Sequence, residues 1–167
     1  MATVTLRGNP CKLDGEMPAV GDKAPDFNLT TGDLSPVTLA THAGKKKVIV
    51  TVPSLDTPVC QTETKRFNEQ AAKLDDVVVL IVSSDLPFAQ TRFCAAEGIE
   101  SVVACSDLRD RGFGERYGVA IADGPLQGVT ARAVIVLDAE DKVVHTELVS
   151  EIAEEPDYDA ALAAASR

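Results

Sequence analysis

The sequence predicts an α/β sandwich in which a mixed central sheet is flanked by helices. Three continuous apolar runs have the length of buried strands, and each is followed by a segment with a helical pattern. Two further apolar runs surround the turn sequence DAED at residues 138–141, which indicates a β-hairpin near the C-terminus. Parallel strands joined by helices, together with an antiparallel hairpin, make a mixed sheet.

The predicted elements follow one another along the chain. Residues 1–20 contain two short segments, VTLRG and CKLDG, which predict an N-terminal β-hairpin extension, and an extended arm follows it. The later elements are a strand at 45–53, a helix from about Pro58 to Leu74, a strand at 76–84, a helix from Pro87 to Gly98, a strand at 101–107, a short helix at 109–119, a hairpin at 131–149 and a helix after Pro156. This order is found in thioredoxin-like folds, although the pattern alone also fits a small doubly wound fold.

Length and charge limit the class of protein. A chain of 167 residues is long enough for one domain, spanning residues 1–167, that buries roughly 70 % of its unfolded surface. The net charge of −10 opposes binding to nucleic acid or to anionic lipid. We find neither a signal-peptide pattern nor an apolar run near the ~20 residues that span a bilayer. We therefore expect no membrane contact and a cytoplasmic location, with the periplasm left open.

The cysteines do not form a metal-binding or disulfide-scaffold pattern. They are widely spaced and contain no C-x-x-C pair: Cys11, Cys60, Cys94 and Cys105. Neither histidine lies near a cysteine in the sequence, so we expect no metal site and no cofactor. A chain of this size does not need a disulfide framework, and a reducing compartment with transient, chemical disulfides fits better. We interpret Cys11 and Cys105 as small packed thiols.

The peptide PSLDTPVC at residues 53–60 directly follows the apolar run KVIVTV. If a helix begins at Pro58, Thr57 is its N-cap, and we expect the Thr57 hydroxyl to accept a hydrogen bond from a free backbone N–H. Cys60 then lies in the first helical turn, among unpaired N–H donors and at the positive end of the helix dipole. This position favours an anion and therefore a thiolate.

The helix end alone does not supply enough stabilisation. Lowering a thiol pKa from about 8.5 to about 6 requires roughly 3.4 kcal/mol, whereas a helix terminus supplies ~0.3–1 and at best ~2 kcal/mol. A cation at ~4 Å contributes about 4 kcal/mol at an effective dielectric of ~20. Arg132, in GVTARAVIVLD, is the leading candidate, although an arginine at a strand end with its head in water is an equally good interpretation. We expect Lys65 and Arg66 to be surface charges.

The spacing of Pro53, Thr57 and Cys60 matches the active-site signature of peroxiredoxins. Three longer segments make the similarity closer: PSLDTPVCQTETKRFNE, GPLQGVTARAVIVLD and EPDYDAALAA. Over essentially its whole length the chain resembles the thiol peroxidase family, the Tpx-type atypical two-cysteine peroxiredoxins.

The resemblance implies a role for each matching residue. Cys60 is implied to be the peroxidatic cysteine, Thr57 and Arg132 to bind the peroxide, and Pro53 to shield the site. Cys94 is implied to be the resolving cysteine, forming an intrachain disulfide with Cys60. The family further implies antioxidant reduction of hydrogen peroxide and alkyl hydroperoxides, with some preference for the latter, recycling by thioredoxin, and a homodimer.

Forming that disulfide requires the two Cα atoms to come within about 7 Å. First-turn residues of neighbouring helices usually lie farther apart, and Cys94 lies well along its helix. We therefore expect one or both segments to unwind locally during the resolving step.

Two other functions compete with this interpretation. A thiol–disulfide oxidoreductase on the same fold needs a C-x-x-C motif at the strand exit, but Cys60 is followed by QTE. A binding or holdase module, whose cysteines only pack, leaves the arrangement of Thr57, Pro58 and Cys60 unexplained.

Overall fold

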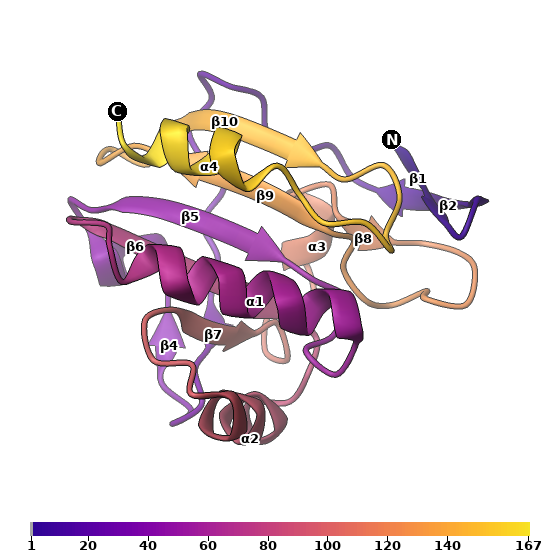
Figure 1. The fold of residues 1–167 in the computed structure, drawn as a ribbon. Helices are drawn as coiled ribbons and strands as arrows, with labels where there is room; N and C mark the ends of the chain where they lie inside the picture. The colour runs from indigo at the N-terminus through magenta and orange to yellow at the C-terminus, as the bar shows by residue number, and fades with distance from the viewer. Residues whose placement is uncertain (1) are drawn as a thin grey trace.

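A computed structural model describes residues 2–167 and contains a seven-stranded mixed sheet with helices around it (Figure 1). Its strands, in spatial order, are β10 (Val143–Leu148), β9 (Ala133–Leu137), β5 (Lys46–Thr51), β6 (Val77–Ser83), β7 (Val103–Ser106), β3 (Leu29–Thr30) and β4 (Pro36–Val37). The three central strands β5, β6 and β7 are parallel, whereas β9 pairs with β5 in the antiparallel sense. The predicted α/β sandwich with a mixed, thioredoxin-like sheet is confirmed.

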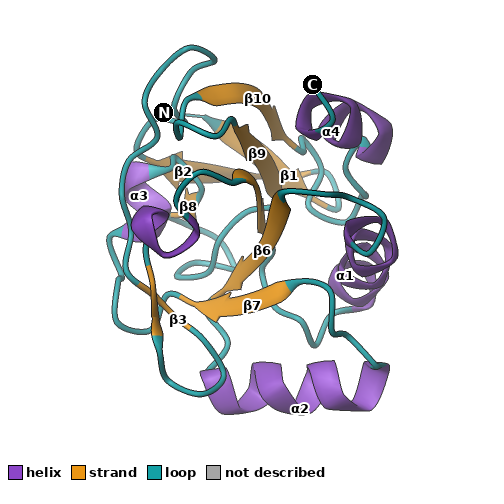
Figure 2. Cartoon of the chain, turned by 90° about the vertical axis from the view of Figure 1, so that its left-hand side faces the viewer, coloured by secondary structure: helices purple, strands orange, loops and turns teal. Residues whose placement is uncertain are grey.

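The helices lie on both faces of the sheet. They are α1 (Pro58–Ala71), α2 (Pro87–Glu97), α3 (Phe113–Arg116), α4 (Tyr158–Ala165) and the 3₁₀ helix η1 (Leu39–His42). Figure 2 shows α1 and α4 on one face, α3 on the opposite face and α2 below β7. As predicted, α2 begins at Pro87 and is followed by Gly98 in the left-handed conformation. Helix α1 ends three residues before the predicted Leu74.

Alternate residues of the central strands supply two separate apolar cores. On β5, Val48 and Val50 belong to the cluster that includes Phe67 of α1, and Ile49 belongs to the cluster that includes Phe113 of α3. The same alternation continues on β6 and β9, because successive side chains of a strand point to opposite faces. The sheet is therefore buried on both sides, which explains its nearly continuous apolar strand sequences.

The N-terminal hairpin is confirmed and is joined to the rest of the molecule. Strands β1 (Thr3–Leu6) and β2 (Asn9–Asp14) are connected by the two-residue loop Arg7–Gly8. Both loop residues have positive φ, as a type I′ hairpin turn requires. Strand β8 (Ala120–Ile121) pairs with β2 and completes a small second sheet.

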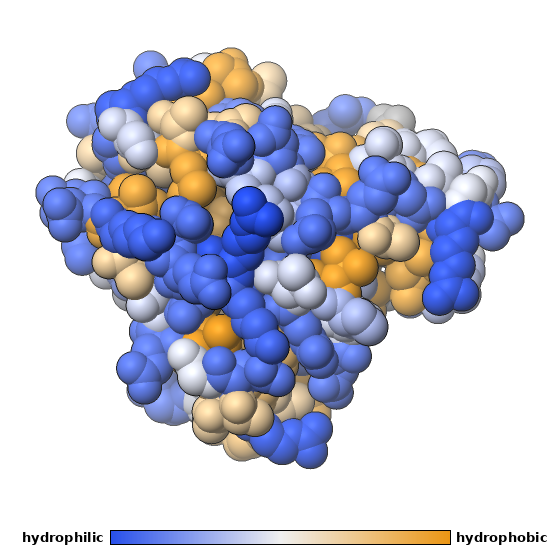
Figure 3. Space-filling view, viewed as in Figure 1, coloured by the Kyte–Doolittle hydropathy of each residue, from blue (hydrophilic) through white to orange (hydrophobic). Residues whose placement is uncertain are grey.

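The three two-residue strands and the four-residue helix η1 could not be predicted from the sequence. Strands β3, β4 and β8 and the helix η1 are not predicted, because segments this short carry no periodicity and owe their conformation to their neighbours. Within residues 2–167, none of the helices is long and apolar enough to cross a membrane. The face seen in Figure 3 is mostly hydrophilic, with apolar residues in small separate areas.

Candidate active site

Cys60 lies in the first turn of α1, at the point where β5 leaves the sheet. Thr57 is the N-cap residue, in an extended conformation, and Pro58 occupies the first helical position. The Cys60 side chain is fully buried, with 0 % exposure. The start of α1 therefore has the local structure that the sequence predicts, and it holds the thiol away from bulk water.

The expected direction of the Thr57 hydrogen bond is wrong. The Thr57 hydroxyl does not accept from the helix; it donates to the carbonyl oxygen of Ser54 at 3.0 Å. The Thr57 N–H also donates to this carbonyl, at 3.3 Å, so residues 54–57 form a tight turn. Within this turn the Thr57 hydroxyl points toward Ser54 and away from the helix. With its proton committed to Ser54, the hydroxyl oxygen has lone pairs left to accept a hydrogen bond from another molecule.

Arg132 lies directly beside the sulfur of Cys60. Its Nη2 donates to Cys60 Sγ at 3.4 Å, its Nη1 pairs with Glu63 Oε2 at 2.5 Å, and its Nε donates to the carbonyl of Ile152 at 3.0 Å. Only 2 % of Arg132 is exposed, so the alternative position with its head in water does not occur. Three contacts from three different nitrogens fix the plane of the guanidinium.

The register of the sheet explains why residues 72 positions apart meet. Strand β9 runs antiparallel to β5, and Ala133 at its start pairs with Thr51 at the end of β5. Arg132, immediately before Ala133, therefore lies at the end of β5 from which the chain continues into α1. The other two cations considered lie elsewhere: Lys65 pairs with Glu97 at 2.8 Å, and Arg66 lies over the ring of Tyr158.

Glu63 is part of the site and was not predicted. It follows Cys60 by three residues, so it lies one turn along the same face of α1, and its side chain is fully buried. Burial raises the pKa of the Glu63 carboxyl to about 7, because the ion pair with Arg132 only partly offsets the loss of water. Burial lowers the pKa of Arg132, but the charges of Glu63 and Cys60 outweigh burial and raise it. The i, i+3 spacing places Glu63 on the same helix face as Cys60, but the sequence alone does not distinguish it from a surface glutamate.

A cavity of about 430 Å³ opens in front of this group of residues. Pro53, Thr57 and Arg132, three of the five predicted site residues, line it together. The remaining walls are mostly apolar and come from α1, the N-terminal hairpin and two loops: Leu6, Arg7, Pro58, Val59, Leu126, Ile152 and Ala153. Cys60 lies behind the Arg132 side chain and is not itself a wall residue.

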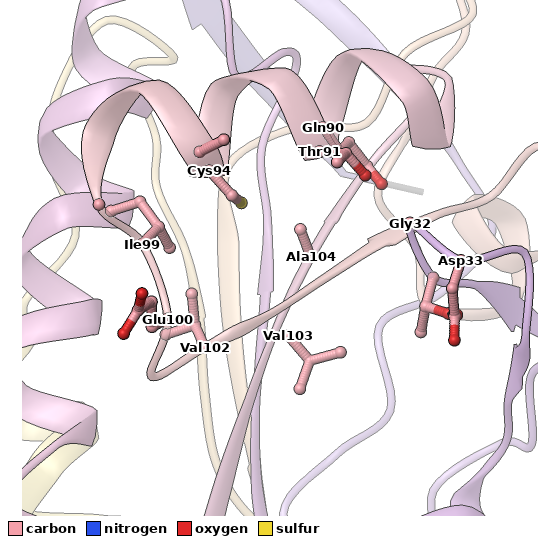
Figure 4. A pocket seen from close by; sticks show the side chains of 13 residues that line it. Gly32, Asp33, Gln90, Thr91, Cys94, Ile99, Glu100, Val102, Val103 and Ala104 are labelled. Carbon is pink, nitrogen blue, oxygen red and sulfur yellow. The ribbon is translucent and has the colours of Figure 1, made fainter.

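The structure places Cys94 at a different cavity. This second cavity, of about 520 Å³, lies between α2, β7 and residues 31–33, and Figure 4 shows the Cys94 side chain pointing into it from the helix. Both Cys94 and Cys60 are free thiols in this structure. Cys94 is partly buried and packs against the same apolar cluster as Cys60, and burial raises the pKa of its thiol. The two sulfurs thus approach the core from separate helices.

The other two cysteines are buried away from both cavities. Cys11 is 1 % exposed and Cys105 is 0 % exposed, and both belong to the core on the α3 side of the sheet. Burial raises the pKa of Cys105 to about 12, which makes its thiol unreactive. Across residues 2–167, no group of three or more His, Cys, Asp and Glu side chains is arranged to hold a metal ion.

Comparison with known proteins gives a consistent family. A family model described as Redoxin matches residues 19–162. The chain is 55 % identical to a thiol peroxidase of Leptospira interrogans over 99 % of its own length and 98 % of the relative's. It is 54 % identical to a thiol peroxidase of Mycobacterium bovis, with 98 % of each chain covered.

The fold agrees with these sequence matches. A crystal structure of a peroxiredoxin-like protein from Aquifex aeolicus superposes with a TM-score of 0.93, at 49 % identity, and covers 98 % of this chain and 95 % of the other. Similarity of this extent covers the strand exit with Cys60, the β9 strand that follows Arg132 and the N-terminal hairpin alike. The chain belongs to the thiol peroxidase family of redoxins and is a thiol-dependent peroxidase.

Proposed function

We propose that this peroxidase reduces hydrogen peroxide and alkyl hydroperoxides with Cys60 as the peroxidatic residue. The supporting observation is the 3.4 Å contact between the Arg132 guanidinium and a fully buried sulfur at the start of a helix. Around a sulfur buried in this way, a guanidinium and free helix N–H groups both favour the thiolate, which is the nucleophile.

In the first step, the Cys60 thiolate attacks one oxygen of the O–O bond. The S–O bond forms, the O–O bond breaks, and the hydroperoxide proton passes to the leaving oxygen, which departs as water or an alcohol. Cys60 is left as a sulfenate, which a proton from solvent converts to the sulfenic acid. Thr57 accepts the hydrogen bond of the hydroperoxide O–H, because its own proton is committed to Ser54. A guanidinium has five N–H donors, more than its three contacts use, and the others stabilise the charge that moves between the peroxide oxygens.

The cavity walls support a preference for alkyl hydroperoxides. Leucine, isoleucine, valine and proline side chains form much of the cavity wall. Transfer of an alkyl group from water to such an apolar surface is favourable. Pro53 lies on this wall, and we propose that it shields the sulfur from water.

In the second step, the Cys94 thiol attacks the Cys60 sulfenic acid, giving the Cys60–Cys94 disulfide and one water. Because the two cysteines lie on separate helices and Cys94 faces a different cavity, the step requires local unwinding. An external dithiol then reduces the disulfide, and we propose thioredoxin as that reductant.

The proposed cycle serves antioxidant defence. A thiol reductant is supplied in reducing compartments, so we propose the cytoplasm as the location.

We also propose a homodimer, because Leu86 and Phe88 at the start of α2 are 51 % and 67 % exposed and a second copy would cover them.

Mass mapping of disulfides after one equivalent of hydroperoxide tests the cycle. The wild type is expected to yield the Cys60–Cys94 disulfide, and Cys94→Ser is expected to stop at a Cys60 sulfenic acid. Loss of Cys60 thiol in the reduced protein should be orders of magnitude faster than that of free cysteine. A rate equal to that of free cysteine would favour a binding module instead.

A further inference from the structure

The loop between β5 and α1 is anchored by an aspartate from another part of the chain. Asp85 lies between the end of β6 and the start of α2. Its Oδ1 accepts a hydrogen bond from the Ser54 hydroxyl at 2.7 Å. Its Oδ2 accepts from the Leu55 N–H at 2.8 Å and from the Ser83 hydroxyl at 2.7 Å. Asp85 thus ties the loop to the adjacent parallel strand.

The same loop residue that Asp85 binds also holds Thr57. The carbonyl of Ser54 accepts both the hydroxyl and the N–H of Thr57, at 3.0 and 3.3 Å. Asp85 therefore holds the side chain of Ser54, and the main-chain carbonyl of the same residue holds Thr57 at the cavity in front of Arg132. Outside these contacts, the turn at residues 54–57 has no strand partner to fix it.

We propose that Asp85 is a positioning residue for peroxide reduction. It holds the turn so that the Thr57 hydroxyl donates to Ser54 and keeps its lone pairs directed at the substrate. A carboxylate suits this role because its oxygens accept from all three donors and its charge strengthens each bond. The inference rests on the role of Thr57 in the proposed function.

Asp85→Asn tests the role with little change in shape. With its oxygen in the Oδ2 position, the amide still accepts from the Leu55 N–H and the Ser83 hydroxyl, but its NH₂ group then faces Ser54 and cannot accept from the Ser54 hydroxyl. Loss of this charged acceptor is worth about tenfold in rate, so we expect the second-order rate constant for oxidation of Cys60 by hydroperoxide to fall about tenfold. Alkylation of Cys60 by iodoacetamide, which does not use Thr57, is expected not to fall. Both rates are measured by quenched flow and mass spectrometry.

Asp107→Asn is the matched control. Asp107 follows the neighbouring parallel strand β7 and accepts from the Ser84 hydroxyl at 3.0 Å, with no contact to residues 54–57. This variant loses the same charge at a similar place and is expected to react with peroxide within about twofold of wild type.

Ser54→Ala removes the hydroxyl that donates to Asp85, and it leaves both Asp85 and the Ser54 carbonyl in place. If Asp85 acts through Ser54, the double variant should be about as slow as Asp85→Asn alone, since residues of one network are not additive. A double variant whose loss in rate is the product of the two single losses would overturn the proposal. So would single variants that react with peroxide at the wild-type rate, or variants in which the peroxide and alkylation rates fall by the same factor. If the wild type itself shows no rapid oxidation of Cys60, the proposed function fails, and not the role of Asp85.

Discussion

At the residue scale, Arg132 joins Cys60, Glu63 and the backbone of Ile152 through one guanidinium. A lysine has a similar charge, but its single ammonium cannot contact all three partners and also donate to a peroxide. The chemistry at this position therefore depends on the planar shape of the side chain as well as on its charge.

Arg132→Lys is therefore expected to lose far more than a charge-conserving substitution normally does. We expect a fall of about 100-fold in the rate constant for peroxide, as for the loss of a donor that stabilises transition-state charge. Alkylation of Cys60 should fall by a smaller factor, because it needs the thiolate but not the peroxide contacts. Peroxide oxidation at nearly the wild-type rate would contradict this role.

Glu63 makes the stability of the protein depend on pH. The pKa of its carboxyl is raised from the ordinary value of 4.5, which applies to the unfolded chain, to about 7 in the folded protein. The folded state therefore holds this proton more tightly than the unfolded state does. The stabilisation from the bound proton is fully present below about pH 4.5 and is lost as the pH rises through about 7.

The Glu63→Gln variant carries no proton to lose. Denaturant unfolding of the reduced protein at pH values from 5 to 8 is expected to show wild type becoming less stable relative to Glu63→Gln as the pH rises. Glu69→Gln, on the exposed side of the same helix, should leave the pH dependence of wild type unchanged. Parallel pH profiles for wild type and Glu63→Gln would rule out this titration.

At the element scale, we expect the proposed resolving step between Cys60 and Cys94 to require local unwinding of their helices. Cys60 lies in the first turn of α1, and Cys94 lies on α2 beside a separate cavity. Amide hydrogen exchange in residues 57–64 and 88–97 is expected to be faster in the disulfide form than in the reduced form, because unwound backbone loses its protecting hydrogen bonds. Equal protection of both segments in the two redox states would show that no unwinding occurs.

Features with a strong local pattern or a large energetic demand can be predicted from the sequence. Pro58 defines the start of α1, and the need for a cation near the thiol identifies Arg132 across 72 residues. Side-chain positions that depend on tertiary contacts cannot be predicted in this way. The Thr57 hydroxyl turns back to Ser54 because of a turn, and Glu63 is indistinguishable from a surface glutamate until Arg132 lies opposite it.

At the scale of the whole molecule, the N-terminal hairpin braces the segment that follows β10. Thr5 exchanges backbone hydrogen bonds of 2.8 Å with Ser150 and Ile152, and the carbonyl of Ile152 is the one that binds Arg132. Glu151 strengthens this junction, since its side chain accepts from the Gly8 N–H at 2.9 Å and from the Thr5 hydroxyl at 3.1 Å. The N-terminal hairpin thus meets residues 150–152 beside the candidate active site.

Glu151→Gln tests that junction through its pH dependence. Hydrogen bonds from the Ala153 and Gly8 N–H groups lower the pKa of Glu151 to about 2. Its contribution to stability is therefore complete above about 4.5 and is lost as the pH falls toward 2. The Tm of wild type should exceed that of Glu151→Gln at pH 7, and the difference should shrink at pH 3.

The control for this experiment is Glu154→Gln, an exposed carboxylate in the same segment. Its Tm should follow that of wild type at both pH values. A constant difference between wild type and Glu151→Gln from pH 7 to pH 3 would mean that the carboxylate does not hold the hairpin. Because Leu6 and Arg7 of the hairpin form part of the cavity wall, a loosened junction should also slow the reaction with a bulky alkyl hydroperoxide more than that with hydrogen peroxide.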